Sequence, residues 1–237
     1  MKKNKFISLN GNTNLYLTVG FPTHQVRSPK DITEEFLKLG LNALMLPVEV
    51  SPRNANDFFI GIKGVNNIRG LVITVPFKFQ AAKICKTLSS RSKLLRSVNI
   101  IRRNPDESWH GDMTDGIGFC NAISRVGTVV KDKKVLLVGA GGAGSAIALE
   151  LIYKGVRHLT IYDINKNKSK ALVKLLNKYY ANISTIQDVV IDGFGIIAHA
   201  TPIGMKKNDP LPLDISKLIS GMHVGDVITK PKITSLI

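Results

Sequence analysis

The chain of 237 residues is 44% hydrophobic and 21% charged, a mixture typical of globular proteins and sufficient for one large domain or two modest ones. It has no apolar run near the ~20 residues of a membrane helix, and its basic start lacks a signal-peptide core, so we expect a cytoplasmic protein without a membrane partner. The formal net charge of +16 comes largely from scattered lysines, without a dense basic run interleaved with aromatic residues. This favours attraction of anionic ligands and argues against a nucleic-acid partner.

Cysteine usage gives no sign of a disulfide framework or a metal site. Cys85 and Cys120 belong to neither a Cys-x-x-Cys pair nor a zinc pattern. We therefore predict two free thiols and no metal.

The first half of the chain alternates strands and helices. Strands are expected over 14–21, 43–50, 70–76, 97–101 and 109–113, and helices over 31–39, 54–63 and 79–95. Pro47 has no amide proton, so the paired part of the second strand is expected to end there. This alternation predicts an α/β domain with a mainly parallel sheet, in which ligands bind at the carboxyl ends of the strands. The polar tips are expected to converge on one edge, and they are Ser28, Lys78, Asn99 and Asp115.

The second half begins after a helix expected over 115–125. Strands are predicted over 134–138, 158–162, 183–186, 195–200 and 222–228, with helices after residue 144 and over 169–176. The domain boundary is placed near residue 119, which gives domains 1–119 and 120–237. The expected fold is therefore two α/β domains, the second of the dinucleotide-binding Rossmann type.

The most informative motif is a glycine-rich turn between a strand and a helix, at 139–144. Gly139 permits the tight turn, Gly141 lets the backbone approach a pyrophosphate, and Gly144 lets the helix pack against the strand. The helix amino terminus offers unpaired amides and a partial positive charge to phosphates. Asp163 ends the next strand, where a carboxylate accepts ribose hydroxyls and repels a 2′-phosphate. The pattern predicts NAD as cofactor, with NADP possible, against the alternative of a turn without a ligand.

Lys78 and Asp115 are the candidate catalytic residues. Lys78 follows a strand end, and Asp115 lies in a turn between two elements. Beside a nicotinamide, such a pair would serve carbonyl–alcohol interconversion, because hydride moves at the carbon while a proton moves at the oxygen. Burial readily lowers the pKa of a lysine, which suits proton transfer. Spacing alone, however, favours a surface lysine and a turn aspartate.

Several segments, in this order, resemble the shikimate/quinate dehydrogenase family over essentially the whole chain. Residues 20–29 resemble its substrate-carboxylate loop, and residues 70–78 its catalytic-lysine strand. Residues 97–99 and 114–119 resemble its substrate-hydroxyl and catalytic-aspartate segment. Residues 201–205 and 226–228 resemble its nicotinamide-side loops. The resemblance implies two α/β domains and reduction of 3-dehydroshikimate, or oxidation of shikimate or quinate, in the chorismate pathway of aromatic amino acid biosynthesis.

The resemblance also implies roles for individual residues. Lys78 and Asp115 would be the catalytic pair, and substrate would be held by Ser28, Thr74, Asn99 and Asp115. The cofactor would be bound by Gly139, Ala140, Gly141, Gly142, Ala143, Gly144, Asp163, Thr201, Gly204, Met205 and Val227.

Departures from the family pattern concern mainly the substrate. A hydroxyl is lost where the carboxylate loop usually has its first serine. A site built around a hydrogen bond discriminates strongly between substrates by that bond, so its loss bears on substrate choice. The sequence also stops before the family's terminal helices, which bring a substrate-binding glutamine. The departing residues are Val26, Val72, Met113, His199 and Thr229.

Two interpretations follow. The first is an NAD(P)-dependent dehydrogenase for a small cyclic hydroxy acid, acting as a monomer or homodimer. The second is a non-catalytic nucleotide-binding remnant, in which the shortened carboxyl terminus loosens the orientation of the substrate.

Overall fold

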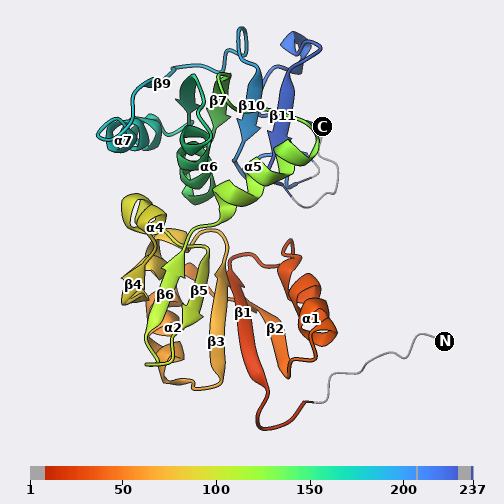
Figure 1. Ribbon diagram of the computed structural model, residues 1–237, viewed down its shortest axis with the longest axis vertical. Coiled ribbons are helices and arrows are strands. Elements are labelled where there is room, and N and C mark those ends of the chain that lie inside the picture. Colours follow the sequence, from red (N-terminus) through yellow and green to blue (C-terminus); the bar gives the residue numbers. More distant parts are fainter. Residues whose placement is uncertain (1–8, 207, 229–235, 237) are drawn as a thin grey trace, which may run out of the picture. The chain divides into compact units, whose positions relative to one another are not determined.

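The computed structural model describes residues 9–206, 208–228 and 236, and it divides into two compact units, Met1–Met113 and Thr114–Ile237 (Figure 1). Both units are α/β structures, as the sequence predicts. The division precedes helix α5 (Asp115–Arg125), whereas the predicted boundary near residue 119 falls inside it. Because α5 packs against α6 (Gly142–Tyr153), the whole helix belongs to the second unit.

The first unit is built on a six-stranded sheet in the order β2-β1-β3-β5-β6-β4. Strands β1 (Asn14–Gly20), β2 (Ala43–Glu49) and β3 (Ile68–Ile73) are parallel. Strand β5 (Ile100–Arg103) runs antiparallel to β3 and to β6 (Trp109–Asp112), and β6 pairs in parallel with β4 (Thr87–Leu88). The helices are α1 (Ser28–Lys38), α2 (Ala55–Gly61), α3 (Lys78–Ala81) and α4 (Ser90–Leu95).

A buried apolar cluster holds this unit together, and it includes Val19, Phe59, Leu71, Ile73 and Phe77. Val19 belongs to β1, Leu71 and Ile73 belong to β3, and Phe59 and Phe77 lie in α2 and just before α3, so the cluster fixes the edge at which β1 and β3 end.

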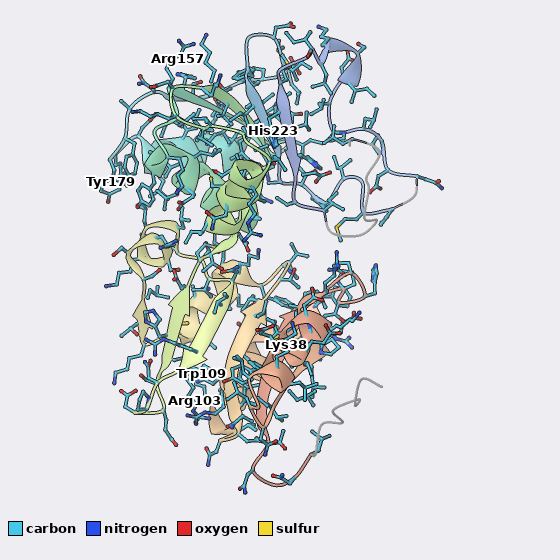
Figure 2. All side chains as sticks on the ribbon, turned by 45° about the vertical axis from the view of Figure 1, so that its right-hand side comes forward. Lys38, Arg103, Trp109, Arg157, Tyr179 and His223 are labelled. Atoms are coloured by element: carbon cyan, nitrogen blue, oxygen red, sulfur yellow. The ribbon has the colours of Figure 1, made fainter. Side chains whose placement is uncertain are left out.

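Arg103 is a buried cation of the first unit's sheet. Its guanidinium donates to the carbonyl oxygens of Val65 at 2.8 Å and Lys63 at 3.1 Å. It also lies 5.6 Å from the ring centroid of Trp109, beside which Figure 2 labels it. These contacts, with Glu107 Oε2 3.7 Å from the guanidinium, offset the cost of burying the charge, although Nε has no hydrogen-bond partner among the described residues.

The predicted helix over 79–95 is wrong. The segment instead forms α3, a 3₁₀ turn at Ala82–Ile84, β4 and α4. The side chain of Ser89 caps α4 by accepting the amide of Ser92, and β4 pairs with β6 from a distant part of the chain. A local apolar period cannot reveal such a non-local strand pair.

Two element ends also differ from expectation. The pairing of β2 continues past Pro47 to Glu49, because β2 is an edge strand and a proline can stay there with its nitrogen on the open side. Helix α1 begins at Ser28 rather than near Asp31, with Pro29 in its first turn, where a missing amide costs nothing.

The second unit contains a five-stranded, fully parallel sheet in the order β11-β10-β7-β8-β9. The strands are β7 (Lys134–Val138), β8 (His158–Tyr162), β9 (Ile183–Thr185), β10 (Ile196–His199) and β11 (His223–Asp226). Helices α5, α6 and α7 (Lys166–Leu176) accompany it (Figure 1). Within the described residues, no helix combines the length and apolarity required to cross a lipid bilayer.

Close packing of α5 on α6 depends on Gly116. A Cβ atom at this position would lie 2.2 Å from the carbonyl oxygen of Ala146, which is backbone and cannot swing away. Gly118, on the same helix, would meet nothing within 4 Å. Gly116→Ala is therefore expected to lower the free energy of unfolding by about 1–3 kcal/mol through overpacking. Gly118→Ala is expected to be neutral or stabilising by roughly 0.5–1 kcal/mol, as alanine is favoured in helices.

Urea denaturation of both variants against the parent chain measures this difference. Equal unfolding midpoints for the two variants would contradict the packing role of Gly116.

Candidate functional site

Polar residues gather at the edge of the first sheet where β1 and β3 end. The amide of Thr74 donates to Val19 O at 2.9 Å, and Ile73 N donates to Asn99 O at 2.7 Å. The Val98 amide donates to Lys78 O at 3.0 Å, which holds the start of α3 beside the start of β5. The backbone thus brings Thr74, Lys78 and Asn99 together. Lys78 and Thr74 are half-buried, and Asn99 is 8% exposed.

Ser28 joins this edge through Thr18, two residues before the end of β1. The hydroxyls of Thr18 and Ser28 lie 2.9 Å apart, and Thr18 Oγ1 also lies 3.2 Å from Met45 Sδ. A serine hydroxyl has one donor and two acceptor sites, so Ser28 can bond Thr18 and still bind a ligand oxygen. Val26 precedes it in the same loop, without a hydroxyl. Asp115, the remaining predicted substrate contact, begins α5 of the second unit.

The three glycines of the motif differ in what surrounds them in the glycine-rich turn. Gly139 has a φ of +110°, and a Cβ there would lie 2.7 Å from Ala200 O. A Cβ on Gly144 would lie 2.0 Å from Gly139 O, inside the turn itself. Gly141, in contrast, has nothing within 4 Å of its Cβ position. The first two are required by the fold, and Gly141 faces space that a ligand can fill.

Helix α6 begins at Gly142, directly after this open position. Among the described residues no side chain caps its amino terminus, and the first amides of a helix lack intrahelical partners. These amides therefore suit an anionic group such as a pyrophosphate. The turn fits a dinucleotide in both shape and charge.

Asp163 contacts the glycine-rich turn directly, which the sequence did not reveal. One carboxylate oxygen accepts the amide of Ala140 at 2.7 Å, and the other accepts the amide of Asn165 at 2.8 Å. Each oxygen has a further lone pair, so capacity for ribose hydroxyls remains. The carboxylate thus places negative charge beside the turn and also braces the turn.

Replacing Asp163 by alanine is expected to weaken NAD binding by about tenfold or more and to weaken NADP binding less, because the charge that repels a 2′-phosphate is lost. Isothermal titration calorimetry with both dinucleotides measures the ratio of the two dissociation constants. Asp192→Ala, an exposed residue before β10, is the matched control. An unchanged NAD-to-NADP ratio in Asp163→Ala would refute the ribose role.

The loop after β10 is held by a carboxylate that sequence reasoning missed. Asp209 accepts the amides of Gly204 at 2.8 Å and Lys206 at 3.0 Å. These amides, that of Lys206 first, lower the pKa of Asp209 below its ordinary value. Gly204 has a φ of +100°, so the bend needs a glycine. The sequence signal for this contact was an aspartate a few residues after a glycine in a loop, because aspartate commonly binds nearby backbone amides.

His199 is the second residue that sequence reasoning left without a role. It lies at the end of β10, fully buried, with Nδ1 3.0 Å from Asp226 Oδ1 and Nε2 2.5 Å from Thr201 Oγ1. Thr201, Gly204, Met205 and Val227 all belong to the loops that follow β10 and β11. Thr229 lies outside the described residues.

Neither cysteine belongs to this chemistry. Both are free thiols, as predicted. Burial raises the pKa of Cys85 to about 12 and that of Cys120 to about 11. Neither therefore supplies a thiolate near neutral pH. Within the part of the chain that the structure describes, no group of three His, Cys, Asp or Glu residues is arranged to hold a metal ion.

Two family models match the chain, the shikimate dehydrogenase substrate binding domain over residues 18–101 and shikimate/quinate 5-dehydrogenase over residues 122–203. The shikimate dehydrogenase (NADP+) of Methanobrevibacter smithii is 32% identical over 238 residues, covering 97% of this chain and 83% of that protein. The chain belongs to the shikimate/quinate dehydrogenase family.

Solved structures agree with this membership of the shikimate/quinate dehydrogenase family. Shikimate 5-dehydrogenase from Listeria monocytogenes, in complex with shikimate and NAD, has a TM-score of 0.83 at 28% identity and covers 97% of this chain and 83% of its own. Shikimate dehydrogenase from Aquifex aeolicus has a TM-score of 0.84 at 27% identity, covering 92% and 80%. The two α/β domains of the predicted fold class are therefore those of the shikimate/quinate dehydrogenase family.

Proposed function

We propose that the chain is an NAD(P)-dependent oxidoreductase that interconverts 3-dehydroshikimate and shikimate, or a related cyclic hydroxy acid such as quinate. The observation that carries this is the coexistence of two sites, one in each unit of the chain. The turn at 139–144 leaves Gly141 open before the amino terminus of α6. The first sheet brings Thr74, Lys78 and Asn99 to one edge.

The nicotinamide, when bound, supplies or accepts the hydride at the carbinol carbon. Lys78 gives a proton to the substrate oxygen during reduction and takes it back during oxidation. Asp115 accepts a hydrogen bond from the reacting hydroxyl. Ser28 binds the carboxylate, and Thr74 and Asn99 bind ring hydroxyls, which holds the reacting carbon in place.

The cofactor form follows from Asp163. The Methanobrevibacter smithii relative is named for NADP+, and the Listeria monocytogenes structure contains NAD. In this chain the Asp163 carboxylate, fixed by the amides of Ala140 and Asn165, favours the unphosphorylated ribose of NAD. Residues 139–144, Thr201, Gly204, Met205 and Val227 complete the cofactor side of the proposal.

Steady-state assays with NAD and NADP against shikimate and quinate test the function. Turnover of at least one acid, with a higher kcat/KM for NAD, is the expected result. Calorimetric binding of NAD without turnover of either acid would overturn the enzymatic proposal and leave a nucleotide-binding remnant. Loss of the loop hydroxyl at Val26 makes the acid, rather than the cofactor, the partner that the assays must define.

A further inference from the structure

A buried chain of side chains joins the carboxyl ends of β10 and β11. His199 and Asp226 are the last residues of these strands and lie opposite each other in the parallel register. Their side chains are 0% and 2% exposed, and the imidazole reaches Thr201 on its other side. His199 has no part in the reaction steps proposed above.

The direction of the hydrogen bond between His199 and Asp226 follows from a neighbouring amide. Asp226 Oδ1 also accepts the amide of Ile228 at 3.0 Å, so this oxygen is an acceptor and His199 Nδ1 carries the proton. Nε2 on the other side of the ring lies 2.5 Å from Thr201 Oγ1, and in the neutral ring it is the acceptor of the Thr201 hydroxyl proton. Thr201 Oγ1 in turn accepts the amide of Ile203 at 3.1 Å.

The same histidine connects two loops. Its ring contacts Asp226, which precedes residues 227–228 of one loop. It also contacts Thr201, which precedes residues 202–205 of the other loop. Its carbonyl oxygen accepts the amide of Val227 at 3.2 Å. A ring with nitrogens on two sides reaches both loops, whereas a shorter side chain such as asparagine projects its polar atoms from one carbon.

We propose that His199 is a positioning residue that fixes the Thr201 loop against the Asp226 loop and thereby sets dinucleotide affinity. The inference rests on the proposed cofactor role of these loops. The Thr201 hydroxyl contacts the buried imidazole, so Thr201 acts on the cofactor through the position of its loop. Because the bonds lie in a buried, low-dielectric setting, their loss is costly.

Calorimetric titration with NAD tests the proposal in His199→Leu, Thr201→Val and the double variant. We expect each single variant to raise the dissociation constant by about tenfold. The double variant should be no worse than His199→Leu, since both changes break the same chain. In steady state, the KM for NAD should rise while the KM for the acid stays the same. His199→Asn keeps a donor toward Asp226 and should raise the dissociation constant for NAD less. This variant replaces His199→Leu in the experiment if the leucine variant does not fold.

His158→Leu is the matched control. It removes a 2.8 Å bond between an imidazole and the Ser184 hydroxyl, at the amino end of β8 in the same sheet, and should leave NAD affinity unchanged. A lowered melting temperature with unchanged NAD affinity in Thr201→Val and His199→Asn would mean a structural role only and would overturn the proposal. A rise in the NAD dissociation constant of the double variant that equals the product of the two single rises would also overturn it. Failure of the parent chain to bind NAD would instead contradict the proposed function on which it rests.

Nitrogen-15 NMR of the imidazole gives a readout that needs no cofactor. The ring of His199, identified by its absence in His199→Asn, should show a protonated Nδ1. A neutral ring protonated only at Nε2 would contradict the proposed bond directions.

Discussion

Lys78→Met should lower kcat by about 10²–10⁴-fold, the usual contribution of a positioned proton donor. Methionine keeps much of the length and the apolar stem of lysine but carries no proton. The dissociation constant for NAD should stay nearly unchanged, because the glycine-rich turn belongs to the other unit of the chain. Steady-state kinetics with the acid identified by the assays, combined with calorimetry, measure the two effects separately.

Lys83→Met is the control for this experiment. Lys83 is an exposed lysine in the 3₁₀ turn just after α3, so its loss should leave kcat at the parent value. Full activity in Lys78→Met would contradict the lysine assignment. Equal loss of activity in both variants would point to a general effect of charge on the anionic substrate.

Two alanine substitutions in the glycine-rich turn should weaken NAD binding for different reasons. Gly144→Ala forces a Cβ to within 2.0 Å of Gly139 O, and we expect it to destabilise the second unit by about 3 kcal/mol or more. Gly141→Ala meets no protein atom within 4 Å, and its φ of −78° suits alanine. The fold should therefore survive, while NAD affinity falls by about 10²-fold because the added methyl displaces the ligand.

Thermal unfolding and NAD titration of the two variants distinguish packing from ligand contact. Gly144→Ala should lose both stability and NAD binding, and Gly141→Ala should lose binding alone. Wild-type NAD affinity in Gly141→Ala would contradict the placement of the pyrophosphate over this residue.

The sequence predicted the features that depend on local chemistry. The strand, glycine-rich turn and helix around Gly139 and Gly144 are confirmed, because tight backbone geometry leaves few residue choices. The helix from Asp115 is also confirmed, and the strand expected over 70–76 exists but spans Ile68–Ile73. In each case the period of apolar residues and a turn residue indicate the same structure.

What the sequence did not predict depends on distant partners. The pairing of β4 with β6 breaks the expected helix over 79–95, and no pattern within that segment shows it. The contacts of Asp163 with the Ala140 amide and of His199 with Asp226 join residues separated by more than twenty positions. Buried polar residues of this kind can be noticed in a sequence, but their partners emerge only from the fold.

The edges of the two sheets limit how this protein can self-associate. In the first sheet, one edge strand is β2, which contains Pro47. The opposite edge strand, β4, spans only Thr87–Leu88. The edge strands of the second sheet, β9 and β11, are also short. Interrupted or brief edges give an incoming strand little to bond with. A homodimer built by sheet extension is therefore disfavoured, and so is edge-to-edge aggregation at high protein concentration.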